Sequence, residues 1–341
     1  MLSKAPMQEE QFFAVSPMMI FPQTLGRFRV FIRQAGRFVL YAAENEQFTP
    51  RHRQKLHDAG VTEVFIRGEQ RPDFNRYIEK HLPQILTDEK IPVPERAKVL
   101  YGTAESVVRD VFETRLPKGL GKREYSRVVS LVERSLEFLA SNESLRAIAA
   151  LTSHDYSVHT HNVQVFVYTA AILQTMKVDE YTMVQAGVGA LLHDIGKTRV
   201  PNEILSKPGP LTPDERLVIN THPVKGVALC QDASLTPTAM QGILLHHERV
   251  DGSGYPGGLT DTLIPDHVKV LTVADVYDAL TSKRAYAEAL PPFQALRLMR
   301  EEMSNHFDMD AFKRLVLILS DAKMVYGRLH FSSESTLPTT Y

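Results

Sequence analysis

The stretch His246-His247-Glu248-Arg249-Val250-Asp251-Gly252-Ser253-Gly254-Tyr255-Pro256 decides how this chain is interpreted, because two adjacent imidazoles run directly into a glycine-rich loop. Upstream, Leu191-Leu192-His193-Asp194-Ile195-Gly196-Lys197 places a His-Asp pair at the end of a strongly apolar segment. Imidazole nitrogens and carboxylate oxygens are groups that hold divalent metal ions. Since both stretches border predicted helices, we expect a metal site inside a helical bundle.

The composition is that of an ordinary globular protein. Of the 341 residues, 43% are hydrophobic and 23% charged, and this length accommodates two domains that each bury a core. The 39 basic and 40 acidic residues give a net charge of −1, which disfavours a broad basic surface for duplex nucleic acid. Cys230 is the only cysteine, so no intrachain disulfide forms. Because no segment suits membrane insertion and residues 1–10 do not resemble a signal peptide, we expect a cytoplasmic protein.

Residues 1–116 are predicted to form a small α+β domain. The alternation of polar and apolar residues over 27–33 is typical of a half-buried strand, and 37–41 follows as a second strand after a turn. Thr49-Pro50 starts a helix that Gly60 ends, and residues 61–66 resume strand character. We identify no family resemblance in the sequence of this domain. Its position alone suggests regulation or contact with a protein partner.

Residues 117–123, rich in Pro, Gly and Lys, are the predicted linker, and the pattern from 124 to 330 is helical. Segments 161–176 and 179–193 are apolar nearly all round, which predicts buried helices. Residues 331–341 form a C-terminal tail. The predicted fold class is therefore mainly α, with an all-helical domain behind the small α+β domain.

Several side chains have the right chemistry and setting for metal ligation. An ionised Asp194 at the end of a buried segment is costly unless it is paired or metal-bound, and Lys197 places an ammonium close by. Asp275 is a carboxylate within an apolar run, with Asp278 three residues later on the same face. His222 is a weaker candidate by itself.

The residue types leave one ligand open, because His154, His159 and His161 all precede the same buried helix. One zinc ion needs about four ligands, whereas a larger set suits two metals that share a carboxylate. With His161 included, the set comprises His161, His193, Asp194, His222, His246, His247 and Asp275.

Residues 124–328 resemble the HD-GYP family of cyclic dinucleotide phosphodiesterases. His193–Lys197 is similar to the family's HD element, and His246–Pro256 is similar to its GYP element. Further similarity lies at 200–212, 221–226, 264–265, 274–284 and 306–308.

The resemblance implies an all-helical, HD-type metal-dependent phosphohydrolase domain with a metal centre in its core, and it selects His161 as the first ligand. One metal would be held by His161, His193, Asp194 and Asp275, and the other by His222, His246 and His247, with Asp194 bridging. A hydroxide between the metals would attack phosphorus while Lys197 steadies charge or supplies a proton. Catalysis is thus assigned to Asp194 and Lys197, and substrate contacts to Arg284, Tyr255, Gly254, Pro256 and Asp251.

Two departures from the family pattern concern metal number and substrate. Ser157 stands where family members with three metals carry a glutamate, so we expect two ions, most readily iron or manganese, with zinc, nickel and magnesium also open. Ala287 replaces a second basic phosphate contact beside Arg284.

The predicted function is hydrolysis of cyclic di-GMP to pGpG, GMP or both. The alternatives are hydrolysis of another, mixed-base cyclic dinucleotide and a low-turnover cyclic dinucleotide sensor. A homodimer is left open.

Overall fold

The computed structural model describes residues 12–20, 26–113, 119–149, 151, 157–283, 288–320, 323–325 and 328–330. The chain forms two compact units, Met1–Ser106 and Val107–Tyr341. Their division falls within helix α3, Val93–Glu113, upstream of the predicted linker at 117–123. Part of that linker lies outside the described residues, as does the predicted tail at 331–341. The predicted domain boundaries therefore stay a prediction.

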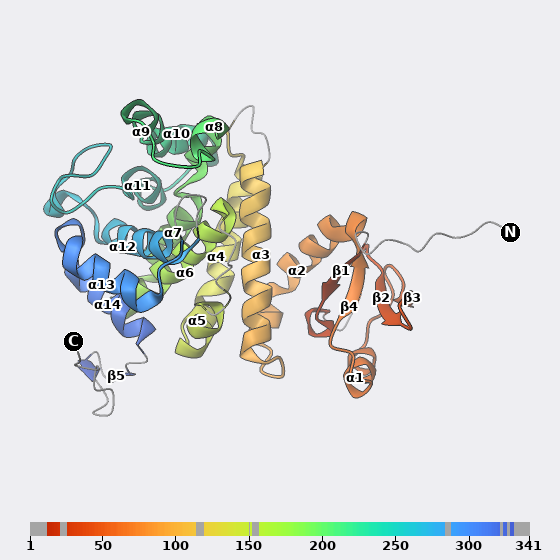
Figure 1. Ribbon diagram of the computed structural model, residues 1–341. Coiled ribbons are helices and arrows are strands. Elements are labelled where there is room, and N and C mark those ends of the chain that lie inside the picture. The colour runs from red at the N-terminus through yellow and green to blue at the C-terminus, as the bar shows by residue number, and fades with distance from the viewer. Residues whose placement is uncertain are drawn as a thin grey trace. The chain divides into compact units, whose positions relative to one another are not determined.

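A four-stranded antiparallel sheet with the order β1-β4-β2-β3 forms the first unit (Figure 1). The turn between β2 and β3 has positive φ at Ala35 (48°) and Gly36 (76°), the backbone that a two-residue hairpin requires. The two predicted strands around this turn are present, whereas β1 was not predicted. The strands are β1 Phe12–Val15, β2 Val30–Gln34, β3 Arg37–Ala42 and β4 Val64–Arg67.

Aromatic packing joins the sheet of this unit to helix α2, Arg71–Thr87. The Phe74 ring meets the rings of Phe13 and Phe28 edge-on, with centroids 5.6 and 5.3 Å apart. The short helix α1, Pro50–Asp58, is followed by Gly60 with a φ of +67°, as the sequence predicts for a helix end.

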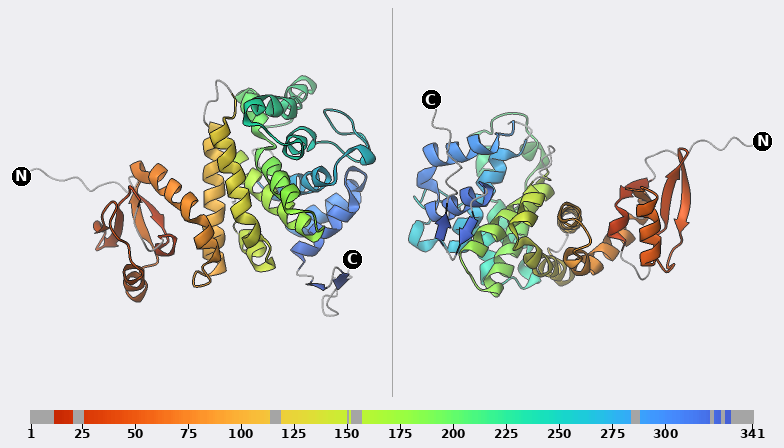
Figure 2. Two further views of the ribbon diagram at one scale, coloured as in Figure 1. Left: turned by 180° about the vertical axis from the view of Figure 1, so that it is seen from behind. Right: turned by 90° about the horizontal axis from the view of Figure 1, so that it is seen from below.

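The second unit is a bundle in which α6 packs against α7, α12 and α14, and α7 packs against α4 and α11. Figure 2 shows these helices from two further sides, with the blue helices packed along one side of the green ones. Nearly every described residue of α6 from His161 to Leu173 is buried, as the all-round apolar pattern predicts. The helices are α4 Lys122–Leu139, α5 Asn142–Ala149, α6 Val158–Thr175, α7 Glu180–Leu192, α8 Asn202–Leu205, α9 Pro213–Ile219, α10 His222–Leu229, α11 Pro237–Leu245, α12 Asp266–Thr281, α13 Pro292–Glu302 and α14 Met309–Leu319.

Local capping fixes where the helices that carry site residues begin. The predicted capping box of α9 is present, since the Thr212 hydroxyl accepts from the Glu215 N–H at 3.2 Å. The hydroxyl of Thr236 caps α11, which ends at the two histidines as predicted. A two-stranded pair, β5 Lys323–Val325 and β6 Arg328–His330, departs from the helical pattern expected up to residue 330. Among the described helices, none combines the length and apolar character needed to span a bilayer.

Candidate metal centre

The seven predicted ligands converge in the core of the helical unit, and we call them the His/Asp cluster. Their ligand atoms form two groups, one of His161, His193 and Asp194 and one of Asp194, His222, His246 and His247, with atoms within 4.8 Å of one another. Asp194 belongs to both groups. The cluster draws on α6, the end of α7, the start of α10, the end of α11, and α12.

The first group lies between α6, α7 and α12. Nε2 of His161 is 3.1 Å from Oδ1 of Asp275, and Nε2 of His193 is 3.6 Å from Oδ2 of Asp194. His193 Nε2 is also 3.9 Å from Asp275 Oδ1. Asp275 therefore lies with this group, as the resemblance implies.

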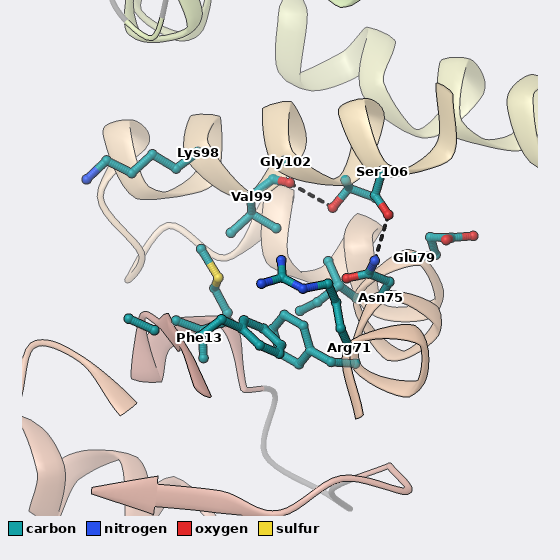
Figure 3. Close-up of a pocket in the computed structure, with 14 residues that line it drawn as sticks. Phe13, Arg71, Asn75, Glu79, Lys98, Val99, Gly102 and Ser106 are labelled. Carbon is teal, nitrogen blue, oxygen red and sulfur yellow. Dashed lines mark hydrogen bonds between the residues drawn. The ribbon is translucent and has the colours of Figure 1, made fainter. Parts of the chain in front are cut away.

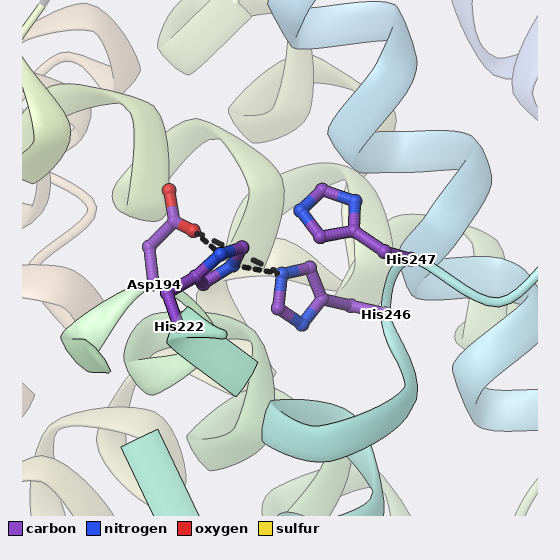
Figure 4. A group of neighbouring side chains, drawn as sticks. All are labelled: Asp194, His222, His246 and His247. Atoms are coloured by element: carbon purple, nitrogen blue, oxygen red, sulfur yellow. Dashed lines mark hydrogen bonds and ion pairs between the residues drawn. The ribbon is translucent and has the colours of Figure 1, made fainter. Parts of the chain in front are cut away.

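The second group gathers around the other oxygen of Asp194 (Figure 4). Oδ1 of Asp194 is 3.3 Å from Nε2 of His222 and 3.8 Å from Nε2 of His246. The ring of His247 is turned toward Asp275, with Nδ1 3.7 Å from Oδ2 of that residue. The two oxygens of Asp194 thus face different groups, which is the geometry of a bridging carboxylate.

Hydrogen bonds to the backbone set the tautomer of three imidazoles. His193, His222 and His246 each place Nδ1 within 2.7, 2.8 and 2.9 Å of the carbonyl oxygen three residues earlier. Because a carbonyl only accepts, each Nδ1 must donate its hydrogen, and in the neutral ring each Nε2 then presents a lone pair. Such contacts typically orient metal-ligating histidines.

This arrangement fits divalent cations, because it leaves electron pairs without hydrogens. Nε2 of His222 and Nε2 of His246 face each other at 3.0 Å. Burial, assisted by the neighbouring His247, holds the pKa of His246 well below its usual value, so this ring is neutral. Nε2 of His193 and Oδ1 of Asp194 are buried without a hydrogen-bond partner. A buried polar atom without a partner is costly, and a bound cation would remove that cost.

The protonation states also suit ligation. Burial alone would raise the pKa of Asp194, but the Lys197 ammonium holds it well below its usual value. The Lys197 Nζ donates to Asp194 Oδ2 at 2.6 Å. Burial lowers the pKa of His247 to about 3. At neutral pH the centre therefore combines the ionised Asp194 and Asp275 with neutral imidazoles at His193, His246 and His247, the forms that bind metals.

Asp278 has a role that the sequence did not reveal. Its Oδ2 accepts from Nδ1 of His161 at 2.7 Å, and the two residues are 117 positions apart in the chain. Asp275 and Asp278 therefore contact opposite nitrogens of the same ring. A carboxylate behind a ligating imidazole fixes its orientation and raises its basicity. The three-residue spacing placed both carboxylates on one helix face, but no sequence signal pointed to His161 as their common partner.

Glu248 anchors the glycine loop, residues 248–260, beside the cluster, and this role was also missed. Its buried carboxylate accepts from the backbone N–H of Gly257 at 2.5 Å and of Leu259 at 2.8 Å. The Tyr255 N–H donates to the His247 carbonyl at 3.2 Å, and the two rings lie 4.7 Å apart. The loop thus holds Tyr255 against the cluster.

The other predicted substrate contacts differ in their placement. A Cβ on Gly254 would lie 2.5 Å from backbone atoms of residues 247–249, so this glycine permits a close approach of two backbone segments. Pro256 is exposed on the loop. Asp251 is exposed as well, and its carboxylate accepts from the N–H and hydroxyl of Ser253 at 2.9 and 2.7 Å. Arg284, together with Ala287, lies outside the described residues.

The structure separates the histidines that sequence chemistry left open. His161 is buried in the cluster, whereas the ring of His159 packs against Phe112 with centroids 5.8 Å apart. His154 lies outside the described residues. Ser157 caps α6, because its hydroxyl accepts from the Thr160 N–H at 3.1 Å.

Comparison with known proteins places this core in a family. A sequence profile described as an HD domain matches residues 134–311, a stretch that contains the whole His/Asp cluster. The chain belongs to the HD domain family. The HD-GYP resemblance inferred from its two motifs is confirmed by the profile and the relatives together.

Relatives of this HD domain protein include cyclic dinucleotide phosphodiesterases. Cyclic di-GMP phosphodiesterase PA4108 of Pseudomonas aeruginosa is 30% identical over 276 residues, covering 77% of this chain and 66% of that protein. The 3'3'-cGAMP-specific phosphodiesterase 3 of Vibrio cholerae is 34% identical over 176 residues, covering 52% of this chain and 38% of that protein. The chain thus spans less than two thirds of the length of these relatives.

A solved structure shares the fold. An HDG"Y"P protein from Bdellovibrio bacteriovorus aligns with a TM-score of 0.65 at 18% identity, covering 91% of this chain and 99% of that one. The predicted fold class, a helical HD-type domain behind a small α+β domain, is confirmed.

Proposed function

We propose that this HD domain protein hydrolyses cyclic di-GMP to pGpG, GMP or both at a centre of two divalent metal ions. The observation that carries the proposal is the pair of ligand groups that share Asp194. Two relatives support the substrate class, since one is named a cyclic di-GMP phosphodiesterase and the other a 3'3'-cGAMP-specific phosphodiesterase.

Each group would hold one ion. His161, His193, Asp194 and Asp275 would ligate the first, and His222, His246 and His247 would ligate the second, with Asp194 common to both. When bound, such ions act as Lewis acids on phosphoryl oxygens and make a hydroxide nucleophile available at neutral pH. Nitrogen and oxygen donors suit iron and manganese, the metals we favour, without excluding zinc, nickel or magnesium.

Lys197 is the best-placed group for proton transfer. Its Nζ lies 2.6 Å from Asp194 Oδ2, and its side chain is 19% exposed, so the ammonium contacts the cluster and remains partly accessible to solvent. From there it can give a proton to the oxygen that leaves phosphorus, or stabilise the negative charge on it.

We assign substrate orientation to Tyr255 and Arg284. The Tyr255 ring stands against His247, 32° from parallel, so a substrate phosphate held at the cluster would lie close to it. We expect Asp251, Gly254 and Pro256 to act through the shape of the glycine loop. Glu248 supports the same loop from its buried side.

The test combines metal analysis with turnover. Protein purified without oxygen is analysed for bound metals and assayed with cyclic di-GMP and 3'3'-cGAMP under identical conditions. We expect two ions per chain and a higher kcat/KM for cyclic di-GMP. A higher value for 3'3'-cGAMP would favour the mixed-base alternative. Tight binding without product from a metal-loaded protein would instead establish a sensor.

A further inference from the structure

A cavity of about 180 Å³ lies within the N-terminal unit, between β1, α2 and α3 (Figure 3). Its walls are largely apolar, with Phe13, Phe74, Ile78 and Val99 among the lining residues. Ligand sites are typically concave, apolar and furnished with a few convergent polar groups. The cavity therefore has the wall chemistry of a small-molecule site.

Arg71 supplies a cation to this cavity. Its guanidinium lies over the Phe13 ring, 4.0 Å from the centroid. Within the described parts of the chain, no carboxylate pairs with it, whereas Lys98, the other cation of the lining, is paired with Glu95 at 3.0 Å. Stacking on an aromatic face leaves the N–H edge of a guanidinium free to bind an oxyanion through two hydrogen bonds.

Polar groups also line the cavity along α2 and α3. The Asn75 amide donates to the Ser106 hydroxyl at 2.7 Å. The Thr103 hydroxyl donates to the Val99 carbonyl at 2.7 Å, so this buried group is satisfied within its own helix. The Ser106 hydroxyl keeps its own hydrogen to donate. The Glu79 carboxylate also lines the cavity, and among the described residues Arg71 is the lining cation without a carboxylate partner.

Gly102 is an exposed residue of the cavity lining. It lies inside α3, where glycine is less favourable than alanine. A Cβ built on Gly102 would meet no atom within 4 Å, so neither packing nor a positive φ requires glycine there. This glycine lines the cavity, and its missing side chain keeps the space open.

We propose that this cavity binds a small organic anion whose apolar body packs against the aromatic wall while its carboxylate or phosphate pairs with Arg71. The size matches, because an apolar cavity of about 150 Å³ is sufficient for benzene. The proposal concerns a second site and is independent of the phosphodiesterase chemistry at the His/Asp cluster.

The test uses the full-length protein labelled with 13C at the methionine methyl groups. Met19 lines the cavity and reports on it directly, with its resonance assigned through Met19→Leu. Benzoate and phenyl phosphate probe the two oxyanions, and benzyl alcohol serves as the uncharged comparison. We expect at least one anion to shift the Met19 signal saturably, with an affinity about tenfold or more above that of benzyl alcohol. Tighter binding of benzoate identifies a carboxylate site, and tighter binding of phenyl phosphate a phosphate site.

Two substitutions locate the binding. Arg71→Met should weaken the anion about tenfold or more. Arg76→Met is the matched control, because this exposed arginine on the same helix pairs with Asp73 outside the cavity. Gly102→Leu should fill the cavity and abolish binding without lowering the unfolding temperature, and Gly102→Ala should weaken it less. The proposal is overturned if neither anion shifts Met19, if Arg71→Met and Arg76→Met behave alike, or if a folded Gly102→Leu protein binds as well as the wild type.

Discussion

The interiors of the two units differ in what they bury. Tyrosines aside, Thr103 is the one buried polar residue among the described residues of the N-terminal unit. Its hydroxyl donates a hydrogen bond within its own helix. The helical unit buries four histidines and four acids, namely His161, His193, His222, His246, Asp194, Glu248, Asp275 and Asp278.

This difference separates a core built for stability from one built around a site. Burying an ionised carboxylate costs several kcal/mol unless charges and hydrogen bonds offset it, so folding alone does not favour such a core. In the N-terminal unit, apolar burial suffices, and each fully buried side chain contributes about 1.5–3 kcal/mol. In the helical unit the buried charges lie in and beside the His/Asp cluster, whose geometry could hold a cation.

The largest effect expected on the helical unit comes from Asp194→Asn. The amide has nearly the same shape but removes the anionic ligand common to both groups. Turnover of cyclic di-GMP should fall by about a thousandfold or more, and bound metal should fall with it. Assays and metal analysis of this variant are compared with Asp179→Asn, at the exposed cap of α7. Unchanged metal content with near wild-type turnover would falsify the assignment of the centre.

Lys197→Met is expected to have the next largest effect. Both kcat and kcat/KM should fall by about a hundredfold or more while metal content is kept, because the lost interaction acts mainly in the transition state. Lys207→Met is the matched control, since Lys207 also donates to a carboxylate, Glu215, at 2.6 Å but outside the cluster. If Lys197→Met raises KM and leaves kcat intact, the ammonium only binds substrate.

Asp278→Asn tests whether a buried charge acts through its neighbour. We expect metal affinity to fall by about 10–100-fold, the usual cost of losing the partner of a ligating histidine. Turnover should recover when metal is added in excess, because His161 itself is unchanged. The activity of this variant is titrated with metal and compared with that of Asp266→Asn, a control at the exposed start of the same helix. A kcat that stays low at saturating metal contradicts a positioning role.

Chelation should produce the most local change, and it probes the comparison directly. Removing ions that bind the folded state destabilises it, by about 4 kcal/mol when metal had been at a thousand times its Kd. Hydrogen exchange should therefore accelerate in α6, α7, α10 and α11. Exchange in β2, β3, β4 and α2 should stay unchanged. Equal loss of protection in both sets of elements would mean that metal removal destabilises both units and not the helical unit alone.

Much of the fold was readable from the sequence, because the signals are local. Capping residues act within one helical turn, so the starts of α9 and α11 follow from Thr212 and Thr236. The turn at Ala35-Gly36 and the helix end at Gly60 likewise depend on the backbone freedom of single residues. Strand β1 was missed because Phe12–Val15 shows no alternation, and the strand pairs with β4, which is distant in sequence.

By itself the sequence determined the ligand types, the HD and GYP motifs, and the helices that carry them. It left His154, His159 and His161 equivalent in chemistry, and only the resemblance chose among them. Tertiary structure decided which nitrogen of each ring faces the centre, that Asp278 supports His161, and that Glu248 holds the glycine loop. The physical reason is range: capping and periodicity act over a few residues, whereas these contacts join side chains that only the packing of separate helices and loops brings within hydrogen-bond distance.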